Sequence, residues 1–443
     1  MHPHARAHTP AVPSLAALAV GVALSFPITA LSFPTAAFAQ EVRLADGDPA
    51  VRRAMASLQQ HQAWTLEQQI SICEIPAPPF KEAVRAEEFR RRLVSFGYAN
   101  ARIDREGNVI AELGAGDGPT VMIAGHLDTV FPEGTDVRTT RTGDRIAGAG
   151  IGDDCRGLAV VLTIAKVMKE TGLVPRGRVL LVGNVGEEGP GNLRGVRHLF
   201  TTEFKDQIDF FISVDGSGGA EITSRAVGSH RYTISFEGPG GHSYSAFGMT
   251  NPMHAMGRAI AKVAALEVPS GARTTFNVGV VRGGTSVNTI TALAQLEIDL
   301  RSESATNLAE MDRRIRAAVA AGVADELARW PNSRAPISVK YDTIGIRPTG
   351  GQADDAFIVR TAMAAATRLD GGPQWTPQTD ATSSDSNIPI SLGIPAITIN
   401  GGGRGGGSHG TEEFYQETAD SYRGPQFALL IVTALAGVAG TAK

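Results

Sequence analysis

The chain has 443 residues, of which 42% are hydrophobic and 19% charged, so it is long enough for two or three domains and too apolar for a disordered protein. Its 41 Lys and Arg against 45 Asp and Glu give a net charge of −4, which offers no basic excess for nucleic-acid binding. Two cysteines exclude a disulfide framework and a sulfur-rich zinc site, so any bound metal must take its ligands from histidines and carboxylates.

Residues 1–39 have the pattern of a secretory signal peptide. A single positive charge precedes an apolar run at residues 15–24, and Ala37-Phe38-Ala39 forms a cleavage motif before Gln40. An uncleaved membrane anchor is disfavoured, because two prolines interrupt the segment and no apolar run nears the roughly 20 residues that span a bilayer. We therefore expect a protein exported to the periplasm or the extracellular space, without a stable membrane span.

Helical and strand patterns alternate through residues 40–227. Charged and apolar residues mix at helical spacing from Val51 to Phe96. Short continuous apolar runs, each ending in glycine or an acid, then predict buried strands. These strands, including one from the C-terminal part of the chain, are Val121–Gly125, Val179–Gly183, Phe210–Val214 and Ala396–Ile399. The alternation predicts an α/β fold with a buried, mostly parallel sheet.

Residues 228–345 have a different pattern. A strand, a helix, two strands, the long helix Asn307–Ala328 and a last strand follow one another, in the β-α-β-β-α-β order of a ferredoxin-like unit. Helix–strand alternation resumes in residues 346–443, which end in an apolar helix at Phe427–Gly440 that is too short to span a membrane. We predict one domain, residues 40–227 and 346–443, interrupted by an inserted domain.

Ionisable side chains follow the predicted strands of the first domain, where ligands bind in an open parallel sheet. Each of them on its own would be an ordinary loop residue, and their significance is that they occur together. These residues are His126, Asp128, Asp153, Glu187, Glu188, Asp215 and His409. In extended chain Asp128 shares a face with His126, so its carboxylate can accept a hydrogen bond from the ring. One carboxylate shared between two metals, beside a free carboxylate base, would make a hydrolytic site.

The motifs that carry these residues resemble those of the di-zinc exopeptidases and deacylases of peptidase family M20. They are H-x-D at 126–128, G-x-G-x-x-D-D at 148–154, E-E-G at 187–189, a strand-end acid at 215 and a histidine at 409. The resemblance covers nearly all of residues 40–443. It implies a zinc-exopeptidase catalytic domain, an inserted lid that also mediates homodimerisation, and two Zn²⁺ or another divalent metal such as Co²⁺ or Mn²⁺.

The resemblance also implies a role for each motif residue. The implied ligands are Asp153 as the bridge between the metals, His126 and Asp215 for one metal, and Glu188 and His409 for the other. Glu187 stands in the place of the general base, which takes a proton from the bridging water and later gives it to the leaving amine. Asp128 is implied to orient His126.

Four further positions are candidates for substrate contacts, and for the three that match the family's lid an ordinary surface role is the alternative. His242 matches a lid histidine that steadies the tetrahedral oxyanion, in some family members from the partner subunit. Asn288 and Arg301 match lid positions that hold a substrate carboxylate. Arg404 lies in the glycine-rich segment 401–407, which we interpret as a flexible wall of the pocket; no second strand follows it, as a dinucleotide fingerprint would require.

The segment after the bridging acid departs from the family, because Cys155 stands where many members have lysine. In an oxidising compartment Cys155 could pair with Cys73, but we expect two separate buried thiols.

The leading hypothesis is therefore an exported zinc exopeptidase that acts on short peptides. The matches to carboxylate-holding positions favour a substrate with a free carboxylate. The glycine-rich segment and Ser384-Asp385 resemble those of peptidase-T-like members, which trim short peptides from the amino end, and this resemblance favours a peptidase. An N-acyl-amino-acid deacylase of the same family is the first alternative. A non-catalytic binding protein that retains the fold is the second.

Overall fold

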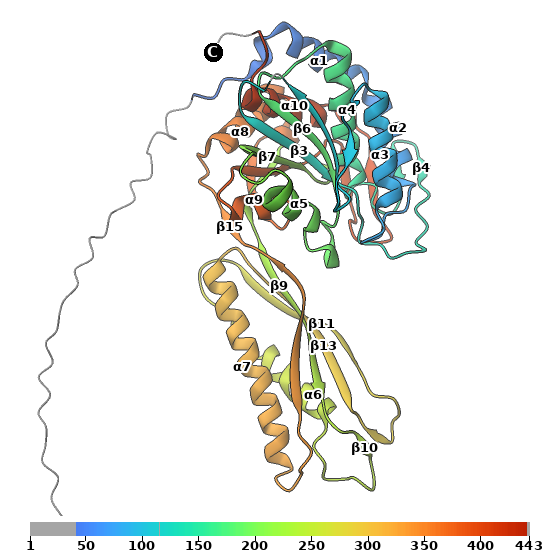
Figure 1. Cartoon of the computed structure of the whole chain (residues 1–443), viewed down its shortest axis with the longest axis vertical. Coiled ribbons are helices and arrows are strands. Elements are labelled where there is room, and N and C mark those ends of the chain that lie inside the picture. Colours follow the sequence, from blue (N-terminus) through green and yellow to red (C-terminus); the bar gives the residue numbers. More distant parts are fainter. Residues whose placement is uncertain (1–40, 115, 441–443) are drawn as a thin grey trace, which may run out of the picture. The chain divides into compact units, whose positions relative to one another are not determined.

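Four parallel strands form the centre of the main sheet (Figure 1). In spatial order they are β6 (Arg178–Asn184), β3 (Thr120–His126), β7 (Phe210–Val214) and β17 (Ala396–Ile399). Their bounds agree within one residue with the four predicted strands, so the parallel α/β sheet is confirmed. The computed structural model describes residues 41–114 and 116–440, and the predicted signal peptide lies outside them.

The edges of this sheet were not predicted; their pairings are antiparallel except that β16 (Gln378–Thr382) pairs with β8 (Glu221–Ala226) in parallel. On one side are β2 (Val109–Gly114) and β1 (Arg102–Ile103), and on the other β8, β15 (Gly350–Gly351) and β16. A second sheet contains β18 (Arg404–Gly406), β19 (Phe414–Gln416), β5 (Arg145–Ala147) and β4 (Thr140–Thr142). Part of the glycine-rich segment, expected as a loop, is therefore the strand β18.

Helices cover both faces of the main sheet, which is why its central strands are apolar throughout. Val121 and Ile123 pack into one core, while Met122 and Ala124 pack into the other. The first layer contains α1 (Pro49–Gln60), α2 (Gln62–Cys73), α3 (Ala83–Ser95), α4 (Cys155–Thr171), α8 (Phe357–Leu369) and α10 (Arg423–Ala436). The second contains α5 (Arg194–His198) and α9 (Asn387–Ser391).

The last helix, α10, is displaced from its predicted bounds by four residues at each end. It stops at Ala436 because Gly437 takes a positive φ of 69°, a conformation that ends helices. Within residues 41–114 and 116–440, no helix combines the length and apolar character needed to span a membrane.

The inserted unit has the β-α-β-β-α-β order that the sequence predicts. Its elements are β9 (Gly228–Glu237), α6 (Pro252–Ala264), β11 (Thr274–Gly283), β13 (Leu293–Ser302), α7 (Ala305–Arg329) and β14 (Ser338–Arg347). The antiparallel sheet has the order β11-β13-β9-β14, and its buried side chains pack against α6 and α7. A short pair, β10 (Gly241–His242) with β12 (Thr289–Ile290), lies outside this sheet.

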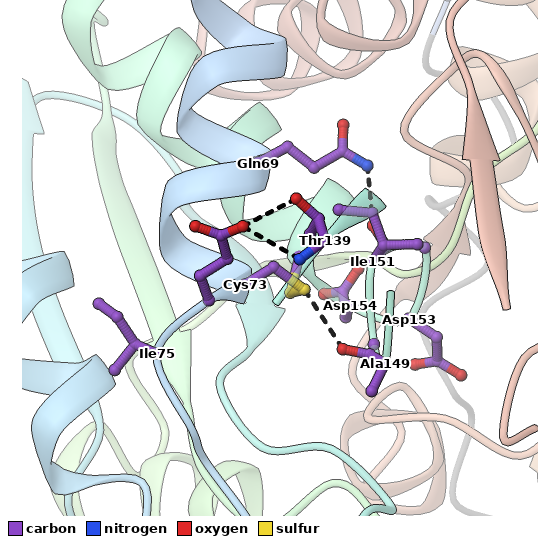
Figure 2. The surroundings of a disulfide bond; sticks show 12 residues. Gln69, Cys73, Ile75, Thr139, Ala149, Ile151, Asp153 and Asp154 are labelled. Atoms are coloured by element: carbon purple, nitrogen blue, oxygen red, sulfur yellow. Dashed lines mark hydrogen bonds between the residues drawn. A yellow bond between two sulfur atoms is a disulfide. The ribbon is translucent and has the colours of Figure 1, made fainter. Parts of the chain in front are cut away.

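Cys73 and Cys155 form a disulfide, so the expectation of two separate thiols was wrong (Figure 2). Cys73 is the last residue of α2 and Cys155 the first of α4. Helix α2 packs against α4 and brings the two Cα atoms to 5.4 Å, within the range that a disulfide needs, although 82 residues separate them. Sequence spacing alone could not reveal that contact.

Candidate metal centre

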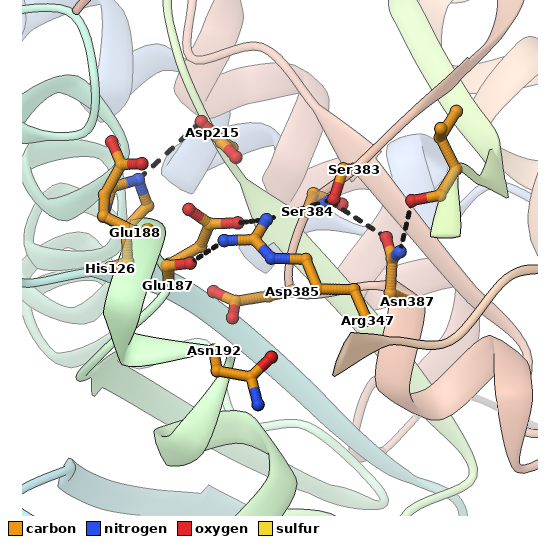
Figure 3. A network of polar contacts seen from close by, with 12 residues as sticks. His126, Glu187, Glu188, Asn192, Asp215, Arg347, Ser383, Ser384, Asp385 and Asn387 are labelled. Atoms are coloured by element: carbon orange, nitrogen blue, oxygen red, sulfur yellow. Dashed lines mark hydrogen bonds and ion pairs between the residues drawn. The ribbon is translucent and has the colours of Figure 1, made fainter. Parts of the chain in front are cut away.

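The carboxyl ends of the central strands bring the predicted ligands together. His126 is the last residue of β3, Asp215 directly follows β7, and Glu188 lies in the loop after β6. Asp153 lies two residues before α4, and His409 lies between β18 and β19. Figure 3 shows His126, Glu188 and Asp215 converging on one region from different strand ends.

Asp153 is shared between two groups of potential metal ligands. Its Oδ1 lies 3.0 Å from Nε2 of His126, which is 3.9 Å from Oδ1 of Asp215. Its Oδ2 lies 3.1 Å from Nε2 of His409, which is 3.2 Å from Oε1 of Glu188. The five side chains thus form two triads with one common carboxylate, the same division that the family resemblance implies.

His126 is oriented differently from the expectation. Its Nδ1 lies 3.0 Å from the backbone carbonyl oxygen of Asp128, whose carboxylate oxygen is farther away at 3.7 Å. Donation from Nδ1–H to that carbonyl leaves Nε2 free to bind a metal. The buried Asp128 carboxylate instead accepts hydrogen bonds from the backbone N–H groups of Glu187, at 3.0 Å, and Glu188, at 2.8 Å. Asp128 therefore connects the loop after β3 to the loop that carries the two glutamates.

The charges of the site fit a bound cation. Burial, together with the charges of Glu187 and Asp153, raises the pKa of Glu188 to about 7. Burial and Asp153 also raise the pKa of Asp215 well above its ordinary value. Hydrogen bonds to Asp153 and Glu188 raise the pKa of His409 to about 10. Several acids thus crowd one buried region and raise one another's pKa, and a divalent metal bound by the same nitrogen and oxygen atoms would offset this repulsion.

A cavity of about 930 Å³ opens beside the two triads. Its walls include Glu187 from the main sheet region and Arg231, Asp299 and Arg301 from the inserted unit. Asp299 accepts a hydrogen bond of 2.8 Å from each of these two arginines. Although burial opposes ionisation, the two hydrogen bonds lower the pKa of Asp299 below its ordinary value, so it holds both guanidinium groups as an anion.

The other predicted substrate contacts do not line this cavity. His242 and Asn288 are exposed on the β10–β12 side of the inserted unit, where Nδ1 of His242 accepts a hydrogen bond from the backbone N–H of Tyr244. Arg404 is exposed at the start of β18, and within the segment 401–407 the residues that line the cavity are Gly405 and Gly406.

A family model described as peptidase family M20/M25/M40 matches residues 122–433. The chain belongs to this family. It is a metallohydrolase that acts on peptide or amide bonds, and the alternative of a non-catalytic binding protein is set aside. Solved structures place the same fold in other members, and one of them is described as a dinuclear metal-binding peptidase.

Three similar proteins illustrate the range of the M20 family. Succinyl-diaminopimelate desuccinylase of Corynebacterium glutamicum is 28% identical over 240 residues, which make up 52% of this chain and 64% of the relative. The structure of the aminopeptidase PepT from Bacillus cereus aligns with a TM-score of 0.65 at 20% identity, over 85% of this chain and 99% of that one. The Bacillus subtilis YXEP protein aligns with a TM-score of 0.59 at 18% identity, over 85% and 99%.

Two acids that sequence reasoning left without a role hold the ligand loops of this M20 protein. Asp154 is buried and accepts hydrogen bonds from the backbone N–H groups of His126 at 2.9 Å, Gly157 at 2.9 Å and Gly216 at 3.2 Å. Glu413 is also buried and binds the backbone of the loop before α4. Asp154 adjoins a ligand in sequence and could have been suspected, whereas Glu413 had no such signal.

Arg347 is a further functional candidate that the sequence analysis missed. Its guanidinium group donates hydrogen bonds to Oε1 of Glu187, at 2.9 Å, to the backbone oxygen of Glu187, and to Oγ of Ser383, at 3.0 Å (Figure 3). Only 5% of the Arg347 side chain and 7% of the Glu187 side chain are exposed. Arg347 lies six residues beyond the predicted strand Ile337–Tyr341, between Ile346 and Pro348, and carries no sequence signal for this contact.

Proposed function

We propose that this M20 protein is an exported exopeptidase that trims short peptides at a dinuclear zinc centre, with Glu187 as the general base. The observation that carries the proposal is the position of Glu187. Its carboxylate lies in one group with His126 and Glu188, next to both triads, and it lines the cavity where a substrate would bind.

In this proposal Asp153, His126 and Asp215 would hold one ion, and Asp153, Glu188 and His409 would hold the other. When bound, two zinc ions supply Lewis acidity, which polarises the scissile carbonyl and lowers the pKa of water. Carboxylate and histidine ligands suit zinc and also Co²⁺ or Mn²⁺, so the identity of the native metal is part of the proposal.

The protein's own groups carry out the proton transfers and hold the substrate. Glu187 takes a proton from the attacking water and transfers it to the nitrogen of the leaving amine as the C–N bond breaks. Arg301, held by Asp299 on the cavity wall, would bind a free carboxylate of the substrate. That contact fixes the distance between the chain end and the scissile bond, which is the defining requirement of an exopeptidase.

The test of this mechanism is Glu187→Gln, which keeps the shape of the side chain and removes the base. We expect hydrolysis to fall by about 100-fold or more with unchanged metal content. Glu112→Gln, a change on the distant strand β2, should leave both unchanged. A Glu187→Gln protein with full activity would show that Glu187 is not the base.

A deacylase of the same family is the second candidate, and its support is the similarity to a desuccinylase. Short peptides and N-acyl amino acids, each with the carboxyl end free or amidated and the amino end free or blocked, distinguish the two. Faster hydrolysis of free peptides than of any N-acyl amino acid would support the peptidase. The opposite preference would favour the deacylase.

Export is supported by the disulfide, because structural disulfides persist mainly in oxidising compartments. We infer that cleavage after Ala39 releases a chain that starts at Gln40 and works in the periplasm or outside the cell. Mass spectrometry of the protein recovered from these fractions should identify Gln40 as the first residue. Retention of residues 1–39 on the exported protein would contradict the inference.

Homodimerisation through the inserted unit would explain why His242 is exposed and does not line the cavity of its own chain. We propose that the partner subunit supplies this histidine to the oxyanion. If so, mixing inactive Glu187→Gln subunits with inactive His242→Ala subunits should restore activity, because one site of each mixed dimer contains both intact residues. Mixtures that exchange subunits but stay inactive would refute this arrangement.

A further inference from the structure

Glu187 is held at three points, and two of them depend on Arg347. Its backbone N–H donates to Asp128, and its backbone oxygen and Oε1 both accept hydrogen bonds from the Arg347 guanidinium group. The hydrogen bond to Oε1 restricts the rotation of the side chain, and Glu187 lines the cavity. A base restricted in this way meets the geometric requirement for proton transfer.

Arg347 is itself fixed by its neighbours on both sides. The backbone N–H of Ile346 donates to Oδ1 of Asn192, at 2.9 Å, in the loop that also carries Glu187. The backbone oxygen of Pro348 accepts a hydrogen bond of 2.9 Å from Asn387. Arg347 is also the last residue of β14 and pairs with Ser229 of β9, so it stands where the inserted unit returns to the main sheet.

We propose that Arg347 is a positioning residue for the general base Glu187, connecting the end of the inserted sheet to the proton-transfer group. The inference rests on the proposed role of Glu187. It requires arginine rather than lysine, because the planar guanidinium group contacts the carboxylate and the backbone oxygen of the same residue at once, which a single ammonium group cannot reproduce.

The alternative is a buried ion pair that only stabilises the fold. A stabilising pair would affect the melting temperature and the yield of folded protein, whereas a positioning residue affects turnover in the folded enzyme. The experiment must therefore measure both. Arg197 offers a matched control, because it donates to the backbone oxygen of Ile346 at the same junction, at 3.1 Å, without any contact to Glu187.

We expect Arg347→Ala to lower kcat by about 100-fold with little change in KM, the size of effect that a misplaced catalytic group produces. Metal content and melting temperature should stay close to those of Arg197→Ala. Guanidinium ion at millimolar concentration should restore part of the kcat of Arg347→Ala, and equal concentrations of NaCl or urea should not. Arg347→Lys retains the positive charge, so it should fold even if Arg347→Ala does not. Its kcat should lie between those of the wild type and Arg347→Ala.

A double-mutant comparison tests whether Arg347 acts through Glu187. In a Glu187→Asp background, where the carboxylate is withdrawn by one methylene, Arg347→Ala should cost far less than in the wild type. Unchanged kcat in Arg347→Ala or Arg347→Lys would overturn the inference. An equal loss of kcat from Arg347→Ala in the wild type and in the Glu187→Asp protein would overturn it as well. Full activity of Glu187→Gln would instead overturn the proposed function, so the two failures are distinguishable.

Discussion

The carboxylate of Glu413 accepts a hydrogen bond from the backbone N–H of Asp153, at 3.0 Å, across 260 residues of sequence. The same carboxylate accepts hydrogen bonds of 2.9 Å from the backbone N–H groups of Gly150 and Gly152. Three donors of the loop that carries the proposed bridging ligand thus converge on one buried acid. Hydrogen bonds within the protein therefore hold this loop in place.

Glu413→Ala should weaken metal binding by about 10- to 100-fold, as the loss of an outer contact to a ligand typically does. It leaves three loop N–H groups without their acceptor, so we also expect a loss of about 1–3 kcal/mol in unfolding free energy. Competition with a metal-binding dye and denaturant unfolding measure the two effects. Glu412→Ala changes the exposed neighbouring glutamate and should alter neither the metal affinity nor the unfolding free energy. Wild-type metal affinity in Glu413→Ala would show that the loop does not need this support.

Replacing single ligands should reveal how the two metal sites are shared. Because Asp153 belongs to both triads, Asp153→Ala should lose metal from both sites, whereas His409→Ala should lose it mainly from one. Metal content after dialysis measures the difference, and a chelator should abolish wild-type activity until metal is restored. His61→Ala, at a histidine paired with Glu170 away from the site, is the control. Equal metal content in Asp153→Ala and the control would contradict the shared ligand.

The part of the site that could be predicted is the part carried by strand ends. His126, Asp215 and the pair Glu187-Glu188 each follow a continuous apolar run, and parallel strands bring such positions to one edge. The roles of Arg347 and Glu413 could not be read in this way, because their contacts join segments far apart in the chain. Likewise, short edge strands such as β18 are formed by pairing with distant partners rather than by their own sequence pattern.

The disulfide should stabilise the protein mainly by lowering the conformational entropy of the unfolded chain. Closing a segment of 82 residues corresponds to about 4.5 kcal/mol of unfolding free energy in the chain-entropy description. We therefore expect the double substitution Cys73→Ser with Cys155→Ser to lower the denaturant concentration at the midpoint of unfolding. The slope of the transition reports whether the substitution also changes the surface that is exposed on unfolding. Thiol titration of the unfolded, unreduced wild type should find no free thiol; two free thiols would mean that the pair does not form in the exported protein.

Arg301 provides the last prediction, which concerns the substrate. It lies on the cavity wall and is held by Asp299, which also holds Arg231, so its guanidinium group is placed before substrate arrives. A charge-assisted contact to a substrate carboxylate is worth about 2 kcal/mol, so Arg301→Ala should reduce kcat/KM roughly 30-fold for peptides with a free carboxyl end. Carboxyl-amidated versions of the same peptides lack that contact and should lose little. Arg282 lies on the neighbouring strand β11 but does not itself line the cavity, so Arg282→Ala should affect neither set. Equal losses for free and amidated peptides would mean that Arg301 does not recognise the carboxylate, and that the exopeptidase preference must arise from another group on the wall.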